Sequence, residues 1–164
     1  VVAGADEVDM VINRGAYLAG DKRLVAEEIS AVKAACGKAK LKVILEVCDL
    51  PGAMEVMEAS KLAIENGADF IKTSTGKGKH GATPDSFFAM CLAVEAHYKA
   101  TGERIGLKAA GGIRTAEDAW LYRSIVQRVL GDSWLAPELF RIGASSLAAG
   151  LEAALFPQAD KHYL

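Results

Sequence analysis

The chain has 164 residues, 51% of them hydrophobic, and a formal net charge of −2. This composition is typical of a globular protein with a sizeable core, so residues 1–164 are predicted to form one domain. The near-neutral charge argues against nucleic acid or an anionic membrane as the main partner. The sequence has no apolar run of the roughly 18 residues that a membrane-spanning helix needs, and no signal peptide precedes the first predicted strand.

Cysteine and histidine usage bears on compartment and on metal binding. Cys36, Cys48 and Cys91 are widely spaced and form no Cys-x-x-Cys pair. His80 and His97 are also far apart, so the pattern predicts neither a disulfide framework nor a metal site. Each thiol is expected to be a small packed side chain in a cytoplasmic, reducing environment.

Short β-like segments alternate with segments of helical spacing along the chain. The chain begins without an initiator Met, in what reads as the last turn of a helix, so we expect a cut N-terminus. The predicted strands are Glu7–Asn13, Leu41–Val47, Asp69–Thr73, Arg104–Ala109 and Leu139–Gly143. The predicted helices between and after them are Asp21–Ala35, Pro51–Asn66, Pro84–Ala100, Ala116–Leu130 and Ser146–Leu155.

The predicted helices carry local start signals. Thr83 precedes a proline suited to a first helical turn, and Thr115 precedes two acidic residues that favour a helix N-terminus. In the second helix, the spacing places four large residues close to one face: Met54, Met57, Leu62 and Ile64.

Five repeated strand–helix units predict an α/β fold with a parallel sheet and right-handed crossovers. Two architectures fit this repeat. An open doubly wound sheet can be completed within 164 residues. A (β/α)8 TIM barrel needs about 250 residues, so this chain would be an incomplete barrel holding strands four to eight.

Charged residues interrupt the predicted strands. Lys42, Lys72 and Lys108 each lie in the middle of an apolar run, and Asp9 lies between Val8 and Met10. Strands that are buried on both faces are almost entirely apolar, and a buried lysine or aspartate needs a partner. One such lysine is best explained by a structural ion pair. Three lysines and an acid at matched strand heights favour a reactive site instead.

Lys72 and Lys108 lie on consecutive predicted strands, about 4.8 Å apart if these strands pair. A like charge and partial desolvation lower a lysine pKa, which frees the amine of Lys72 to attack a carbonyl. Asp9, across the intervening strand, is placed to move protons through water.

The loops after the last two strands are rich in anion-binding groups. Glycines, hydroxyls and one arginine precede capped helices there, in a position where barrel enzymes often bind phosphate. Tight turns alone would explain one of these loops well and both poorly. The residues concerned are Gly111, Gly112, Ile113, Arg114, Gly143, Ser145 and Ser146.

Residues 76–81 match the G-x-G-x-x-G pattern of dinucleotide-binding loops. The strand before them ends in polar residues and the next helix waits until Pro84, so this loop does not fit that motif. We interpret it as a mobile cationic flap with Lys77 near a substrate phosphate.

Four segments, residues 4–9, 70–77, 106–118 and 141–146, closely resemble the deoxyribose-phosphate aldolase family in order and spacing. The resemblance implies a TIM barrel that cleaves 2-deoxy-D-ribose 5-phosphate reversibly to acetaldehyde and D-glyceraldehyde 3-phosphate, with no metal and no cofactor. It matches Lys72 to the Schiff-base lysine, Lys108 to the partner that lowers the amine pKa, and Asp9 to a proton relay.

The same resemblance assigns the substrate phosphate to Gly76, Lys77, the residue 111–114 loop and the serine pair 145–146. Lys42, Thr75 and Tyr163 are further candidate site residues, although Leu164 follows the tyrosine that often ends this family. The expected partners are a phosphosugar and an aldehyde, in deoxyribonucleotide and carbohydrate breakdown.

Comparison with the family also implies that the first three strand–helix units are missing. The exposed strand edges of such a remnant would favour self-association, so a homo-oligomer is one expected state. Two alternatives remain. The chain is a non-catalytic phosphosugar-binding or assembly fragment, or it is another Schiff-base aldolase with a different acceptor.

Overall fold

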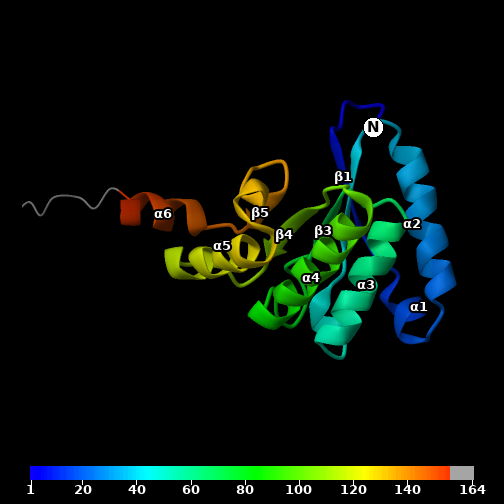
Figure 1. Ribbon diagram of the computed structural model, residues 1–164, viewed down its shortest axis with the longest axis horizontal. Helices are drawn as coiled ribbons and strands as arrows, with labels where there is room; N and C mark the ends of the chain where they lie inside the picture. The colour runs from blue at the N-terminus through cyan, green and yellow to red at the C-terminus, as the bar shows by residue number, and fades with distance from the viewer. Residues whose placement is uncertain (156–164) are drawn as a thin grey trace, which may run out of the picture.

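The computed structural model describes residues 1–155 and contains one five-stranded sheet (Figure 1). Its strands are β1 (Glu7–Val11), β2 (Lys40–Ile44), β3 (Phe70–Lys72), β4 (Gly106–Ala110) and β5 (Phe140–Gly143). The helices are α1 (Arg14–Leu18), α2 (Lys22–Cys36), α3 (Ala53–Glu65), α4 (Pro84–Thr101), α5 (Ala116–Leu130) and α6 (Leu147–Leu155). Two short 3₁₀ helices cover residues 47–49 and 132–134. The five predicted strands and five predicted helices are therefore all present, and α1 is an additional element.

The strand order distinguishes the two predicted architectures. All neighbouring strands are parallel, and the order is β1-β2-β3-β4-β5, which is also the chain order. In a doubly wound sheet, the order in which strands are added reverses at a switch point, so the connecting helices lie on both faces. Sequential right-handed crossovers instead put the helices on one face, as in a barrel. In Figure 1 α2, α3 and α4 lie side by side along the sheet.

The two faces of the sheet differ in chemistry because side chains alternate along each strand. Leu41 and Val43 of β2 point to the helical side and are fully buried in the hydrophobic core. The residue between them, Lys42, belongs to the opposite face, as do Asp9 of β1 and Lys72 of β3. This second face corresponds to the interior of a barrel, and we call it the inner face.

The helix starts agree with the capping signals, and the packing of α3 departs from the expected face at Met54. Thr83 and Thr115 each cap a helix and accept a bond from the third backbone N–H. The buried face of α3 consists mainly of small residues: Val56, Ala59, Ser60, Ala63 and Ile64. Of the four large residues expected close to one face, Ile64 is buried, Met57 and Leu62 are partly buried against the core, and Met54 is exposed. Among the described residues, no helix is long and apolar enough to span a membrane.

Candidate active site

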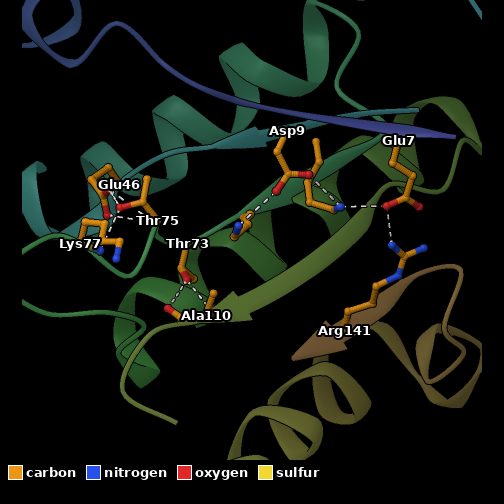
Figure 2. Close-up of polar contacts among 10 residues, drawn as sticks. Glu7, Asp9, Glu46, Thr73, Thr75, Lys77, Ala110 and Arg141 are labelled. Carbon is orange, nitrogen blue, oxygen red and sulfur yellow. Dashed lines mark hydrogen bonds and ion pairs between the residues drawn. The ribbon is translucent and has the colours of Figure 1, made fainter. Parts of the chain in front are cut away.

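Strand register places two of the predicted site lysines side by side. Lys72 of β3 is the direct register partner of Lys108 of β4. The hydroxyl of Thr73 locks this register at the carboxyl end of the pair: it donates to the Ala110 carbonyl at 3.0 Å and accepts from the Ala110 N–H at 2.9 Å (Figure 2). Because the Thr73 side chain is fully buried, slippage of the two strands would break two bonds without replacement by water.

A chain of alternating charges crosses the inner face from β5 to β3 (Figure 2). Arg141 Nη1 donates to Glu7 at 2.6 Å, and Lys42 Nζ donates to Glu7 at 2.8 Å and to Asp9 at 3.0 Å. Lys72 Nζ completes the chain with a bond of 3.1 Å to the second oxygen of Asp9. The proposed relay acid therefore contacts the proposed nucleophile directly, across the intervening β2.

These contacts keep both carboxyl groups ionised. The hydrogen bond from Arg141, followed by that from Lys42, lowers the pKa of Glu7 to about 2. Burial raises the pKa of Asp9, but the hydrogen bonds from Lys42 and Lys72 outweigh burial, and the net direction is downward. Asp9 is thus a carboxylate at neutral pH, able to accept a proton.

The expectation of three lysines at matched heights is wrong for Lys42. In the register, Lys42 aligns with Asp9 and with Phe70, two residues before Lys72. Its side chain is only 5% exposed and its ammonium bonds to two carboxylates, so it has the surroundings of a structural ion pair. The Phe70 ring lies below it, with the Lys42 ammonium 5.6 Å from the ring centroid. Lys42 therefore belongs to the floor of the site, where it holds Asp9.

Lys108 lies at the end of the charge chain without a carboxylate bonded to it among the described residues. Burial is the main cause that lowers its pKa, and the positive charges of Lys72 and Lys42 lower it further. Its side chain passes over Gly143, where an added Cβ would lie 3.0 Å from Lys108 Cε. A glycine at this position of β5 therefore leaves room for the second lysine.

The predicted phosphate loops surround one cavity of about 520 Å³ at the carboxyl ends of β3, β4 and β5. The loop of residues 76–81 folds back onto the Gly111 loop so closely that a Cβ at Gly81 would lie 2.2 Å from the Gly111 carbonyl carbon. Ala82 N–H donates to the Ala110 and Gly111 carbonyls. The residues that line the cavity are Lys72, Thr75, Gly76, Lys77, Lys108, Ala110, Gly111, Gly112, Ile113, Arg114, Gly143, Ala144, Ser145 and Ser146.

This cavity unites both predicted lysines with every predicted phosphate-binding residue, including Gly76 and Lys77. Asp9 and Lys42 lie behind it and reach it through Lys72. The backbone N–H of Arg114 donates to Asp118 at 3.0 Å, so Arg114 has its side chain, rather than this N–H, available for an anion. Tyr163 lies outside the described residues.

Sequence reasoning missed three charged residues that the structure places at the site or directly behind its loop. Glu7 and Arg141 form the outer end of the charge chain, and the signal was present in Glu7, which precedes Asp9 by one strand period. Glu46 is an acid between Leu45 and Val47 that is only 3% exposed. The same criterion that identified Asp9, a charge within an apolar run, would have identified Glu46.

Comparison with known proteins defines the family. Residues 1–150 match the family model described as DeoC/LacD family aldolase. Deoxyribose-phosphate aldolase of Homo sapiens is 44% identical over 160 residues, which cover 98% of this chain and 50% of that protein. That of Bos taurus is 42% identical with the same coverage. The chain thus spans about half the length of the curated relatives it matches.

The solved structures agree at the level of the fold. The tetrameric deoxyribose phosphate aldolase from Aeropyrum pernix superposes with a TM-score of 0.69 at 29% identity, over 94% of this chain and 57% of that chain. The five parallel strands therefore correspond to about half of a (β/α)8 barrel, which confirms the predicted barrel architecture. This chain belongs to the DeoC/LacD family of aldolases.

Proposed function

We propose that this chain carries the Schiff-base site of a class I aldolase, which cleaves 2-deoxy-D-ribose 5-phosphate reversibly to acetaldehyde and D-glyceraldehyde 3-phosphate. One observation carries the proposal: Lys72, paired in register with Lys108 and bonded to Asp9, lines the same cavity as the donor-rich loops. The cavity thus offers an amine for a carbonyl at one end and anion donors at the other. Family membership supports the same chemistry.

In the direction of synthesis, the uncharged Lys72 amine adds to the carbonyl carbon of acetaldehyde, and the carbonyl oxygen takes up a proton. The new hydroxyl takes up a second proton, which Lys72 passed to Asp9 when it became an uncharged amine, and leaves as water to give an iminium. Lys108, whose lowered pKa increases its share of free amine, removes a proton from the methyl carbon and leaves an enamine.

The enamine carbon then forms the new C–C bond to the aldehyde carbon of glyceraldehyde 3-phosphate. The alkoxide regains a proton from the Lys108 ammonium, directly or through water held by Asp9. Hydrolysis of the iminium consumes one water and releases the sugar phosphate, so the lysines and the water balance over the cycle. The phosphate-binding loops orient the acceptor throughout.

Borohydride trapping with acetaldehyde tests this assignment, with the modified peptide located by mass spectrometry. We expect a reduced adduct on Lys72, none in Lys72→Arg, and slower formation in Lys108→Leu. Lys99→Leu, on the exposed surface of α4, serves as the control and should give the wild-type yield. Equal adduct yields from wild type and Lys72→Arg would refute the assignment. Phosphate binding without any adduct would favour the alternative, a non-catalytic phosphosugar-binding or assembly fragment.

A further inference from the structure

The loop that carries Gly76 and Lys77 is held from behind by a buried acid that takes no part in the mechanism above. Glu46 follows β2 and is only 3% exposed. The Thr75 backbone N–H donates to both oxygens of its carboxylate, at 3.2 and 3.3 Å, and the Thr75 hydroxyl donates to one of them (Figure 2). The same hydroxyl accepts from the Lys77 backbone N–H at 3.1 Å. The Glu46 carboxylate therefore holds Thr75 directly and Lys77 through the Thr75 hydroxyl.

The backbone at Glu46 is itself unusual. Its φ of 54° is in the left-handed region, and among the described residues it is the one non-glycine residue with positive φ. Such a conformation costs roughly 1–2 kcal/mol for a residue with a side chain, so it persists only where surrounding contacts enforce it. Backbone bonds on both sides enforce it here: Leu45 N–H donates to Lys72, and Val47 N–H donates to Thr73. The carboxylate is thus anchored to the strand that carries the proposed nucleophile.

The loop also packs directly against this segment. A Cβ at Gly78 would lie 2.4 Å from Cys48 Sγ and 3.4 Å from Glu46 Oε1. Glu46 lines a second cavity, of about 680 Å³, whereas Thr75 and Lys77 line both this cavity and the proposed phosphate cavity. The acid therefore lies on the far side of the loop from the phosphate cavity and can act on an anion only through the loop.

We propose that Glu46 is a positioning residue that sets the Thr75–Gly76–Lys77 turn for a phosphate group and so gives the site its preference for phosphorylated over unphosphorylated sugars. This inference rests on the proposed function of the cavity. Because the Lys77 N–H is taken up by Thr75, Lys77 has its ammonium to offer an anion. A carboxylate suits this position because an ionised acceptor holds N–H and O–H donors about twice as strongly as a neutral one.

Two readouts separate this proposal from the proposed function. Titration with inorganic phosphate, followed by ³¹P NMR, reports the loop. Borohydride trapping with acetaldehyde, which carries no phosphate, reports Lys72. Glu46→Ala removes every acceptor, and we expect it to weaken phosphate binding about ten-fold or more, the effect of losing a charge-assisted hydrogen bond. Glu46→Gln retains one acceptor and should give an intermediate loss. Acetaldehyde trapping should fall much less than phosphate affinity in both variants.

Thr75 supplies a matched pair if Glu46→Ala does not fold. Thr75→Val keeps the shape and removes the hydroxyl that links Glu46 to Lys77, whereas Thr75→Ser keeps that hydroxyl. We expect weakened phosphate binding in the first and near wild-type affinity in the second. Asp49→Asn removes an acid of the same segment whose partner is Arg14, and it serves as the charge control.

The outcomes decide between the two ideas. Wild-type phosphate affinity in Glu46→Ala or in Thr75→Val would overturn the positioning role, and so would a parallel loss of trapping and phosphate binding. Absence of phosphate binding in the wild-type chain would also overturn it. A wild-type chain that binds phosphate in a Glu46-dependent manner but forms no adduct would refute the aldolase assignment alone.

Discussion

The ion pair between Glu7 and Arg141 should make the fold sensitive to acid in a defined pH window. Glu7 ordinarily has a pKa of 4.5, and its hydrogen bonds from Arg141 and Lys42 lower that pKa to about 2. At about 1.4 kcal/mol per pH unit, this difference corresponds to an upper limit of about 3.5 kcal/mol. Water reaches the carboxylate, whose side chain is 25% exposed, so screening reduces the expected contribution to about 1–2 kcal/mol.

The sign follows from the depressed pKa. The unfolded chain binds a proton at Glu7 at a higher pH than the folded chain does, so acid favours unfolding. The contribution is fully present above about pH 5 and is lost as the pH falls towards about 2. Glu7→Gln should therefore destabilise the protein at neutral pH by about 1–2 kcal/mol, and its difference from wild type should shrink through this window.

Urea unfolding of wild type and Glu7→Gln across this pH range measures the difference directly, since the other carboxylates titrate in both proteins. Glu27→Gln is the control, because Glu27 is 59% exposed and pairs with Arg23 on the surface of α2. It should change the free energy of unfolding by less than about 0.5 kcal/mol. A Glu7→Gln difference that stays constant with pH would show that the ion pair does not hold β1 to β5.

Three further outcomes follow from the inner face and its supports. Lys72→Met should raise the pKa of Lys108, because burial remains but the strongest neighbouring positive charge is removed; a ¹³C NMR titration of lysine Cε measures it. Thr73→Val should destabilise the protein by about 2 kcal/mol in urea unfolding, because the buried Ala110 N–H loses its acceptor while the Ala110 carbonyl keeps only the bond from Ala82; Thr73→Ser should cost less. Gly106→Ala should cost about 1–3 kcal/mol, because its Cβ would lie 2.2 Å from the Phe70 ring; an unchanged unfolding midpoint would contradict this packing.

The sequence was sufficient for the alternation of strands and helices and for most of the site. Lys72 and Lys108 lie in short apolar runs whose ends are marked by caps and glycines, so their strands could be aligned and their pairing is confirmed. The height of Lys42 could not be derived in the same way. Parallel strands in a barrel are staggered, and a shift of two residues changes neither the alternation nor the buried face. Only the register shows that Lys42 aligns with Phe70 rather than with Lys72.

The contacts that could not be predicted from the sequence are those between distant segments. Glu7 and Arg141 are 134 residues apart, and no local pattern links an acid near one terminus to an arginine near the other. The role of Glu46 depends on a left-handed backbone conformation, which cannot be predicted from a glutamate in the sequence. The exposure of Met54 could not be predicted for a related reason: the spacing of hydrophobic residues along α3 does not show which side of the helix packs against α4.

The order of charges on the inner face gives a reason for the different proposed roles of Lys72, the nucleophile, and Lys108, the base. Along the chain of contacts, Arg141, Lys42 and Lys72 alternate with two carboxylates, so each of these cations has an ionised neighbour. Lys108 lies beyond the last carboxylate, and burial, followed by the positive charges of Lys72 and Lys42, lowers its pKa. A phosphate ester carries about −1.5 to −2 charge at neutral pH and would be bound in the cavity that Lys108 lines. Under the proposed function, the positive charges of Lys72 and Lys42, which add to burial in lowering the pKa of Lys108, therefore also attract the substrate phosphate.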